Sequence, residues 1–309
     1  MPLAAQKLRL ITTGACNLAC FYCHNEGQAK EDTFARPGDL RRVSTAVRDR
    51  GLLVSEVTIS GGEPLLHPEL DDIVSLAAGA CARVTMVSNG LLADARRLDR
   101  LAAAGLRKLR LGVDSLDTTK PRPSRGRLPT PFLVGEVIDA ARAAGLEVDL
   151  NTVLTRYNRQ EVSTLIALAQ TMNVSIKFFE HVAVQTFGAD GTGGVMAAKP
   201  QVPYEDFLQQ ARLTLGQFAE FTPAGAFGDA NLHHVAGDFE VRYCRYLCNF
   251  DLCWLTGTRI DPQGYVYNCM SNRGIDRVTG RMTLEELADV LERGSARRCR
   301  SVADRAPLR

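Results

Sequence analysis

Residues 8–23 read LRLITTGACNLACFYC, an apolar run that leads directly into Cys16, Cys20 and Cys23. The run predicts a β-strand, and the C-x3-C-x2-C spacing after it places these thiols in one loop. Three thiolates cannot ligate every iron of a four-iron cluster, so one iron is left open to bind and reduce a small molecule. The stretch therefore predicts a strand whose following loop holds a reactive iron–sulfur cluster.

The composition is that of an ordinary globular protein. Its 309 residues are 45% hydrophobic, and 37 basic side chains nearly balance 35 acidic ones. This balance argues against nucleic acid or an anionic membrane as a partner, and no apolar stretch is long enough to span a bilayer. No hydrophobic signal segment precedes the first strand, and nine cysteines cannot all pair. We therefore expect a reducing, cytoplasmic location rather than a disulfide framework.

Apolar runs alternate with helical patterns through the first part of the chain, which predicts an α/β fold. Six βα-type units in a row predict a parallel sheet with right-handed crossovers, a partial (β/α)6 barrel over roughly residues 5–182. The expected strands are 8–12, 57–60, 83–88, 109–113, 147–154 and 174–179, and the expected helices lie near 39–50, 68–79, 94–104, 132–144 and 160–171.

The character of the sequence changes after residue 183, where a glycine-rich link precedes a segment rich in cysteine and aromatic residues. We predict domains at 1–183 and 184–309, with helices at 204–215 and 283–293 in the second. In parallel barrels chemistry gathers at the C-terminal ends of strands. The cysteine loop, Gly61-Gly62-Glu63-Pro64, Asn89 and Asp114 all follow strands in this way.

The cysteine spacing, the aromatic pair Phe21-Tyr22 and the run from Ser60 to Pro64 together resemble the radical S-adenosylmethionine (SAM) superfamily. The resemblance implies a TIM-like partial barrel whose [4Fe-4S] cluster cleaves SAM to a 5′-deoxyadenosyl radical. It gives Gly61, Gly62, Glu63 and Pro64 the task of holding the SAM amino group. Two alternatives stay open: the cysteines with His24 could bind zinc, and G-G-E-P could be an ordinary turn.

Further segments occur in the order found in the molybdenum-cofactor GTP 3′,8-cyclase group, and the resemblance covers nearly the whole chain. They are residues 113–117, 151–153, Asn158 and 178–180. In the radical SAM resemblance, Tyr22 could contact adenine and Asn89 could bond the SAM ribose or carboxylate, although Asn89-Gly90 could be only a turn. Gly112 stands where that group has a serine for the ribose, so we expect Asp114, Ser115 or Asn151 to make that contact.

A second cysteine group consists of Cys244, Cys248, Cys253 and Cys269. By resemblance it holds an auxiliary [4Fe-4S] cluster in a twitch-like C-terminal extension. Its spacing differs from that of the cyclases, and Cys244 or Cys299 as a fourth ligand would close the cluster to substrate. Structural zinc is the alternative. Arg259 aligns with one substrate-binding arginine of the cyclases, and Gly257 replaces the other.

Other basic groups are candidates for substrate binding. Arg125 and Arg127 lie with Lys120 and Arg122 in a proline-rich loop after the fourth strand, where they could grip a phosphate or carboxylate or could simply be solvated. His233 and His234, expected in a loop, could be acid–base groups, although exposed loop histidines are commoner. His181, which follows the sixth strand, is the better-placed candidate.

Taken together, these features favour a radical SAM enzyme that modifies a nucleoside or nucleotide in secondary metabolism, by sugar rearrangement, epimerisation, decarboxylation or sulfur insertion. Its implied electron donor is a flavodoxin or ferredoxin. The alternatives are a GTP 3′,8-cyclase, a peptide-modifying maturase and a zinc-stabilised interaction protein without enzymatic activity.

Overall fold

The structure is a computed structural model that describes residues 6–23, 26, 32–116, 134–181, 202–224, 231–245, 257–267, 276–277 and 283–296. The predicted boundary between residues 183 and 184 lies outside these ranges and stays a prediction. Cys248, Cys253, Cys269, Cys299 and His24 also lie outside them, as do Lys120, Arg122, Arg125 and Arg127.

The described strands form one sheet in the order β12-β11-β10-β1-β2-β3-β4-β5-β6-β9-β8-β7. Its strands are β1 (Gln6–Ile11), β2 (Val54–Ser60), β3 (Val84–Ser88), β4 (Leu106–Gly112), β5 (Glu147–Leu154), β6 (Ser175–Glu180), β7 (Thr222–Pro223), β8 (Asn231–Ala236), β9 (Phe239–Cys244), β10 (Thr258–Ile260), β11 (Tyr265–Tyr267) and β12 (Asp276–Arg277). The helices are α1 (Pro37–Asp49), α2 (Leu70–Ala78), α3 (Ala95–Ala103), α4 (Val134–Ala143), α5 (Val162–Thr171), α6 (Tyr204–Leu215) and α7 (Leu284–Ala296).

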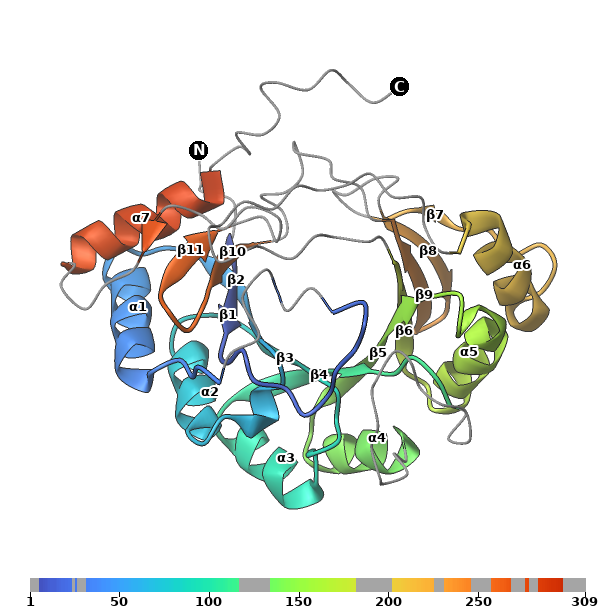
Figure 1. Ribbon diagram of the computed structural model, residues 1–309, viewed down its shortest axis with the longest axis horizontal. Coiled ribbons are helices and arrows are strands. Elements are labelled where there is room, and N and C mark those ends of the chain that lie inside the picture. Colours follow the sequence, from blue (N-terminus) through green and yellow to red (C-terminus); the bar gives the residue numbers. More distant parts are fainter. Residues whose placement is uncertain are drawn as a thin grey trace.

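The sheet has a parallel centre and antiparallel margins. Parallel pairing runs from β10 through β1 to β6 and on to β9, whereas β11 and β12 at one end and β8 and β7 at the other are antiparallel. Figure 1 shows this sheet curled into an open barrel, with the helices outside it and the loop after β1 on its concave side. The predicted α/β partial barrel is confirmed, and strands from beyond residue 184 extend its sheet at both margins.

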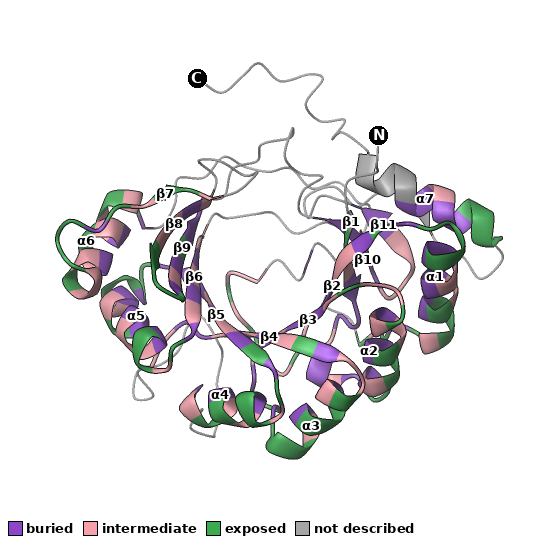
Figure 2. Ribbon diagram, turned by 180° about the vertical axis from the view of Figure 1, so that it is seen from behind, coloured by how far each residue is buried: buried purple, intermediate pink, exposed green. Residues whose placement is uncertain are grey.

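Side chains of opposite character alternate along the strands because successive residues face opposite sides of a sheet. In β5 the residues from Val148 to Leu154 at even positions are buried, whereas Asp149, Asn151 and Val153 remain partly accessible. The buried side faces the helices, as Phe178 of β6 shows by packing on Phe207 of α6 at a ring-centroid distance of 5.2 Å. Figure 2 shows the same division between the sheet and the outer helix surfaces.

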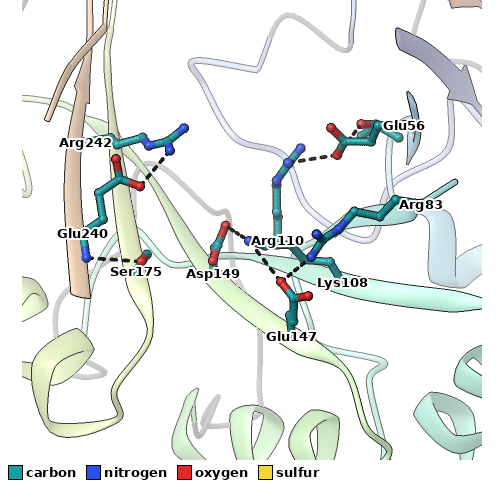
Figure 3. A network of polar contacts seen from close by, with 10 residues as sticks. Glu56, Arg83, Lys108, Arg110, Glu147, Asp149, Ser175, Glu240 and Arg242 are labelled. Carbon is teal, nitrogen blue, oxygen red and sulfur yellow. Dashed lines mark hydrogen bonds and ion pairs between the residues drawn. The ribbon is translucent and has the colours of Figure 1, made fainter. Parts of the chain in front are cut away.

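The inner face of the barrel carries paired charges in addition to apolar side chains such as Val153, whereas branched aliphatic side chains dominate the interior of ordinary (β/α)8 barrels. Arg110 of β4 bonds Glu56 of β2 at 2.9 Å, and Lys108 bonds Asp149 at 2.5 Å. Glu147, on the neighbouring strand, is shared by Lys108 and Arg83. Figure 3 shows these side chains meeting inside the barrel. The lumen is therefore polar and lined by ions that neutralise one another.

The structure confirms the six predicted βα strands and their helices, and also the two helices expected later in the chain. Thr283 caps α7 as a capping box, since its hydroxyl accepts from Glu286 N at 3.1 Å while Glu286 accepts from Thr283 N at 2.8 Å. One expectation is wrong: His233 and His234 lie in strand β8 and not in a loop. Within the described ranges, no helix is both long and apolar enough to cross a membrane.

We expect the ion pair of Glu56 with Arg110 to make stability depend on pH. Burial raises the pKa of Glu56, but Arg110 and the Thr85 hydroxyl more than offset this, so its pKa lies below the usual value. A depressed pKa contributes stability that is present at neutral pH and is lost as the pH falls through the folded-state pKa. Glu56→Gln should therefore cost roughly 1–2 kcal/mol at neutral pH and little near pH 3.

Chemical unfolding at several pH values measures this difference. Glu220→Gln is the matched control, because Glu220 is exposed on the outer side of the molecule. An equal loss for both variants at every pH would contradict the assignment.

Candidate active site

The loop after β1 is held against the loop after β2 by backbone pairing. Gly62 N donates to Thr13 O at 2.7 Å, and Glu63 N donates to Ala15 O at 2.8 Å. A Cβ at Gly61 would lie 2.6 Å from Thr13 O, and one at Gly62 only 2.0 Å from Ala15 O. Gly61 also has a φ of +147°. The two glycines are therefore required by the close approach of the cysteine loop.

The three candidate cluster ligands lie at this mouth of the barrel. Cys16 is exposed, and Cys20 and Cys23 are partly exposed at a turn in which Cys23 N donates to Cys20 O at 3.1 Å. Asn89 follows β3 and reaches the same loop, since its amide nitrogen donates to Asn17 Oδ1 at 2.7 Å and lies 4.0 Å from Cys16 Sγ. The structure therefore brings Asn89 beside the cysteine loop, although 73 residues separate it from Cys16.

The Glu63 carboxylate fixes the position of Asn89. It accepts hydrogen bonds from Ser88 Oγ at 2.7 Å, from Asn89 N at 2.8 Å and from Leu65 N at 3.0 Å, and its residue is 1% exposed. Pro64 begins the short helix η2 (Pro64–Leu66), for which Glu63 is the N-cap. Glu63 thus joins the loops that follow β2 and β3, a structural task that the predicted contact with SAM does not include.

Tyr22 and Asp114 connect the cysteine loop to the ends of β4 and β5. The Tyr22 hydroxyl donates to Asp114 Oδ2, while Asp114 Oδ1 accepts from Val153 N at 2.9 Å. The ring of His181 lies edge-on to Phe21 and Tyr22, at centroid distances of 5.6 and 6.2 Å. The predicted residues Tyr22, Asp114 and His181 are therefore brought together beside the cysteines.

Ser115 and Asn151 occupy different positions around Asp114. The Ser115 hydroxyl donates to Glu161 at 2.9 Å, which ties the segment after β4 to the start of α5. Asn151 pairs with Gly112 across β5 and β4, and its carbonyl accepts from Val113 N at 2.8 Å. Asn151 lies on the lumen side of β5 and is partly accessible, so of the two it is better placed to meet a ligand.

Arg259 belongs to a buried ion cluster that the sequence did not reveal. Arg9 of β1 and Arg259 of β10 are direct neighbours in the sheet, and both bind the carboxylate of Glu26, at 2.5 and 3.3 Å. Ser60 Oγ donates to the same carboxylate at 2.8 Å, and Tyr267 donates to the Glu26 carbonyl at 3.0 Å. Arg259 is 4% exposed, so a substrate group that contacts it must share this arginine with Glu26.

Cys244 is the member of the second cysteine group that the structure describes. It ends β9 on the lumen side, where its thiol donates to Asn231 Oδ1 at 2.5 Å and lies beside Lys177 of β6. Burial raises the pKa of this thiol and lowers that of Lys177. Its role as a cluster ligand stays a prediction. Cys81 donates to the carbonyls of Ala77 and Arg83, both at 3.2 Å, and these contacts give its thiol a structural role.

The cysteine loop suits an iron–sulfur cluster better than a single metal ion. Among the described residues, no three Cys, His, Asp or Glu side chains converge in an arrangement for one ion. Each thiolate of a four-iron cluster binds a different iron, so the three sulfurs need not meet at one point. The donor set, its accessibility and the backbone cradle at Gly61 and Gly62 fit such a cluster with SAM beside it.

Comparison with known proteins agrees with this geometry. The sequence model of the Radical SAM superfamily matches residues 10–169, which is more than half of the chain. The match spans the cysteine loop, the glycine pair and the strands from β2 to β5. The chain therefore belongs to the radical SAM superfamily.

Named relatives and a solved structure are similar to the chain. A probable GTP 3′,8-cyclase of Pyrobaculum aerophilum is 32% identical over 57% of this chain and 57% of its own length. One of Methanothermobacter marburgensis is 26% identical over 85% of this chain and 84% of its own. Streptococcus suis SuiB bound to S-adenosylmethionine matches with a TM-score of 0.64 at 17% identity, over 93% of this chain and 65% of that one, which supports the fold alone. The chain thus spans little more than half of the first relative.

We expect Gly62→Ala to disrupt the cluster loop. Its Cβ would stand 2.0 Å from Ala15 O, so the loop would have to move away from β2. The variant should bind clearly less iron after anaerobic reconstitution and lose most SAM cleavage. Gly38→Ala is the control, because a Cβ there meets nothing within 4 Å. Iron content measured with 5′-deoxyadenosine formation tests this, and full iron loading of the Gly62 variant would refute it.

Proposed function

We propose that this protein uses SAM to modify a small, polar nucleoside or nucleotide in the barrel lumen. The observation that supports this most strongly is the charged inner wall, which lies beneath the cysteine loop and is partly accessible along β5. A lumen lined by Lys108, Arg110 and Asp149 suits a substrate rich in hydroxyl, amide or anionic groups. An apolar substrate would leave these ions buried without water.

Residues of the chain would share the work of binding SAM. Cys16, Cys20 and Cys23 would hold the cluster, which when bound supplies the electron for reductive cleavage of SAM. Asn89, fixed by Glu63, and Asp114, fixed by Tyr22 and Val153, would bind the polar parts of the molecule. Gly61 and Gly62 allow the backbone to come close.

A GTP 3′,8-cyclase is the second candidate, favoured by the names of the relatives. The structure gives a reason to rank it second. Gly257, which replaces one arginine of the cyclase pattern, has a φ of +88°, and a Cβ there would lie 2.6 Å from Lys7 O. An arginine cannot be placed at this position without moving β1 or the chain before β10. The close packing at Gly257 therefore argues against an arginine at this position of the cyclase pattern.

The C-terminal region would complete the enzyme with a second [4Fe-4S] cluster on Cys244, Cys248, Cys253 and Cys269. We further propose a cytosolic location and a flavodoxin or ferredoxin as the electron donor, because a free-thiol protein of this kind requires reducing conditions. A peptide substrate, as in a maturase, has no support beyond the fold it shares with SuiB.

Two clusters predict about eight irons per chain after anaerobic reconstitution. Changing Cys16, Cys20 and Cys23 together to Ala should abolish 5′-deoxyadenosine formation and leave about four irons on the second site. Metal analysis with optical spectra measures this. About four irons with one zinc in the native chain would show that the second site is structural, and SAM cleavage by the triple variant would refute the cluster assignment.

Substrate choice and Arg259 are tested together. The wild type is incubated with SAM, a reductant and each of the common nucleoside triphosphates and their nucleosides, GTP included, and products are followed by mass spectrometry. Arg259→Lys should lower turnover of the active compound about 10- to 100-fold, or roughly 1.5–3 kcal/mol for a lost charged hydrogen bond, because Lys cannot replace the planar guanidinium. SAM cleavage without substrate should change little.

Arg107→Lys is the control for this comparison. Arg107 is exposed near the start of β4, at the end of the strand that lies away from the cysteine loop. Efficient cyclisation of GTP by the wild type would establish the second candidate in place of the first. Unchanged turnover in Arg259→Lys would remove Arg259 from the substrate site.

A further inference from the structure

The two histidines of β8 face opposite sides of the sheet. His234 points to the outer side, where its Nδ1 lies 3.0 Å from Glu220 O and its ring packs near Phe221. His233 Nδ1 lies 2.7 Å from Glu240 Oε1 on β9. Side chains that alternate along a strand point to opposite faces, so the contact of His234 with Phe221 places His233 on the inner side. The chain therefore offers one histidine to the lumen and a matched one outside it.

The register of the sheet sets the row of paired residues in which His233 lies. His233 pairs with Arg242 of β9, Arg242 with Lys177 of β6, and Lys177 with Asn151 of β5. Asn151 is a candidate SAM contact, so His233 occupies the same row of the sheet as the proposed active site. Figure 3 shows Glu240 and Arg242 directed toward the interior that Asp149 and Arg110 also face.

The carboxylate of Glu240 holds both basic neighbours, one on each oxygen. His233 bonds Oε1 and Arg242 bonds Oε2, each at 2.7 Å, and Ser175 Oγ accepts from Glu240 N at 3.3 Å. Burial raises the pKa of Glu240, but the hydrogen bonds from Arg242 and His233 outweigh it and leave the pKa below its usual value. An ionised carboxylate only accepts, so Nδ1 carries the hydrogen and Nε2 is the atom that can gain a proton.

A carboxylate-oriented imidazole with an accessible ring is the arrangement used for proton transfer. The side chain of His233 is 29% exposed and that of Glu240 is 19% exposed, so a lumen ligand can reach the imidazole while the carboxylate stays sheltered. Among the described residues, the other titratable groups near this row on the inner face are Lys177 of β6, Cys244 of β9, Asp149 of β5 and Arg110 of β4.

We propose that His233 is a general acid–base residue that takes a proton from a hydroxyl or N–H group of the substrate in the lumen. This inference rests on the proposed function and adds a residue to it. The O–H or N–H bond of the substrate breaks, an N–H bond forms at Nε2, and the proton is later released to water. The bonding electron pair stays on the substrate atom, the lone pair of Nε2 forms the new bond, and no oxidation state changes. Glu240 is a positioning residue that fixes the tautomer, and Arg242 keeps Glu240 ionised.

The test compares His233→Gln with His234→Gln in the reconstituted full chain. The probe is whichever compound of the nucleoside and nucleotide panel the wild type converts. His233→Gln should lower product formation about 100-fold, the lower range for a lost acid–base group, while iron content and substrate-free SAM cleavage stay as in the wild type. His234→Gln should leave all three unchanged. Product formation by His233→Gln equal to that of His234→Gln would overturn the proposal.

A second variant separates proton transfer from a structural role. Glu240→Gln should move the acidic limb of the pH–rate profile to lower pH, because a neutral amide stabilises an imidazolium less than a carboxylate does. If His233→Gln fails to bind iron, this shift decides the question, and an unmoved limb overturns the proposal. If the wild type converts no nucleoside or nucleotide, the proposed function fails first and this inference falls with it.

Discussion

The close contact between the loops after β1 and β2 is the constraint on which the site depends. Gly62 N and Glu63 N continue the pairing of β1 with β2 beyond the ends of these strands. A Cβ at Gly61 or at Gly62 would collide with the backbone of the loop after β1. This contact places the cysteine loop over the C-terminal ends of the strands. The backbone N–H of Glu63 takes part in this contact, and its carboxylate binds Asn89 N and so holds Asn89 beside Cys16. One backbone approach thus orders groups from three strands.

The open barrel combines a polar interior with a stable α/β fold. The outer faces of the strands pack against helices, as Phe178 and Tyr243 do against Phe207. The inner faces carry ions that bind one another, between strands as in Lys108–Asp149 and Arg110–Glu56 or within one strand as in Arg242–Glu240. Burial is therefore compensated before any ligand arrives. Apolar burial on one face supplies stability and leaves the other face for chemistry.

Much of this could be predicted from the sequence because it depends on local patterns. The apolar runs predicted the strands. The cysteine spacing and the G-G-E-P run predicted which residues lie at the mouth of the barrel. The β8–β9 hairpin was missed although part of its signal is present. Gly237-Asp238 is a two-residue turn followed by the alternating run FEVRYC of β9, whereas NLHHVA of β8 does not alternate. Such short strands with a charged inner face resemble loops in composition, which is why His233 was expected in one.

The ion cluster of Arg9, Glu26 and Arg259 could not be predicted, because local sequence patterns do not indicate which distant residues meet. Glu26 and Arg259 lie 233 residues apart, and only the parallel pairing of β10 with β1 places Arg259 beside Arg9. Glu26 follows Cys23 by three residues, so its carboxylate ties the end of the cysteine loop to both strands. Removing Glu26 would leave Arg9 and Arg259 side by side without the carboxylate that both bind, which is far more costly than losing a surface pair. The loop proposed to bind the SAM cluster and the strand that leads toward the second cysteine group are therefore held by the same charges. A substrate group that binds Arg259 would therefore contact a residue that is already ion-paired with Glu26 at the end of the cysteine loop.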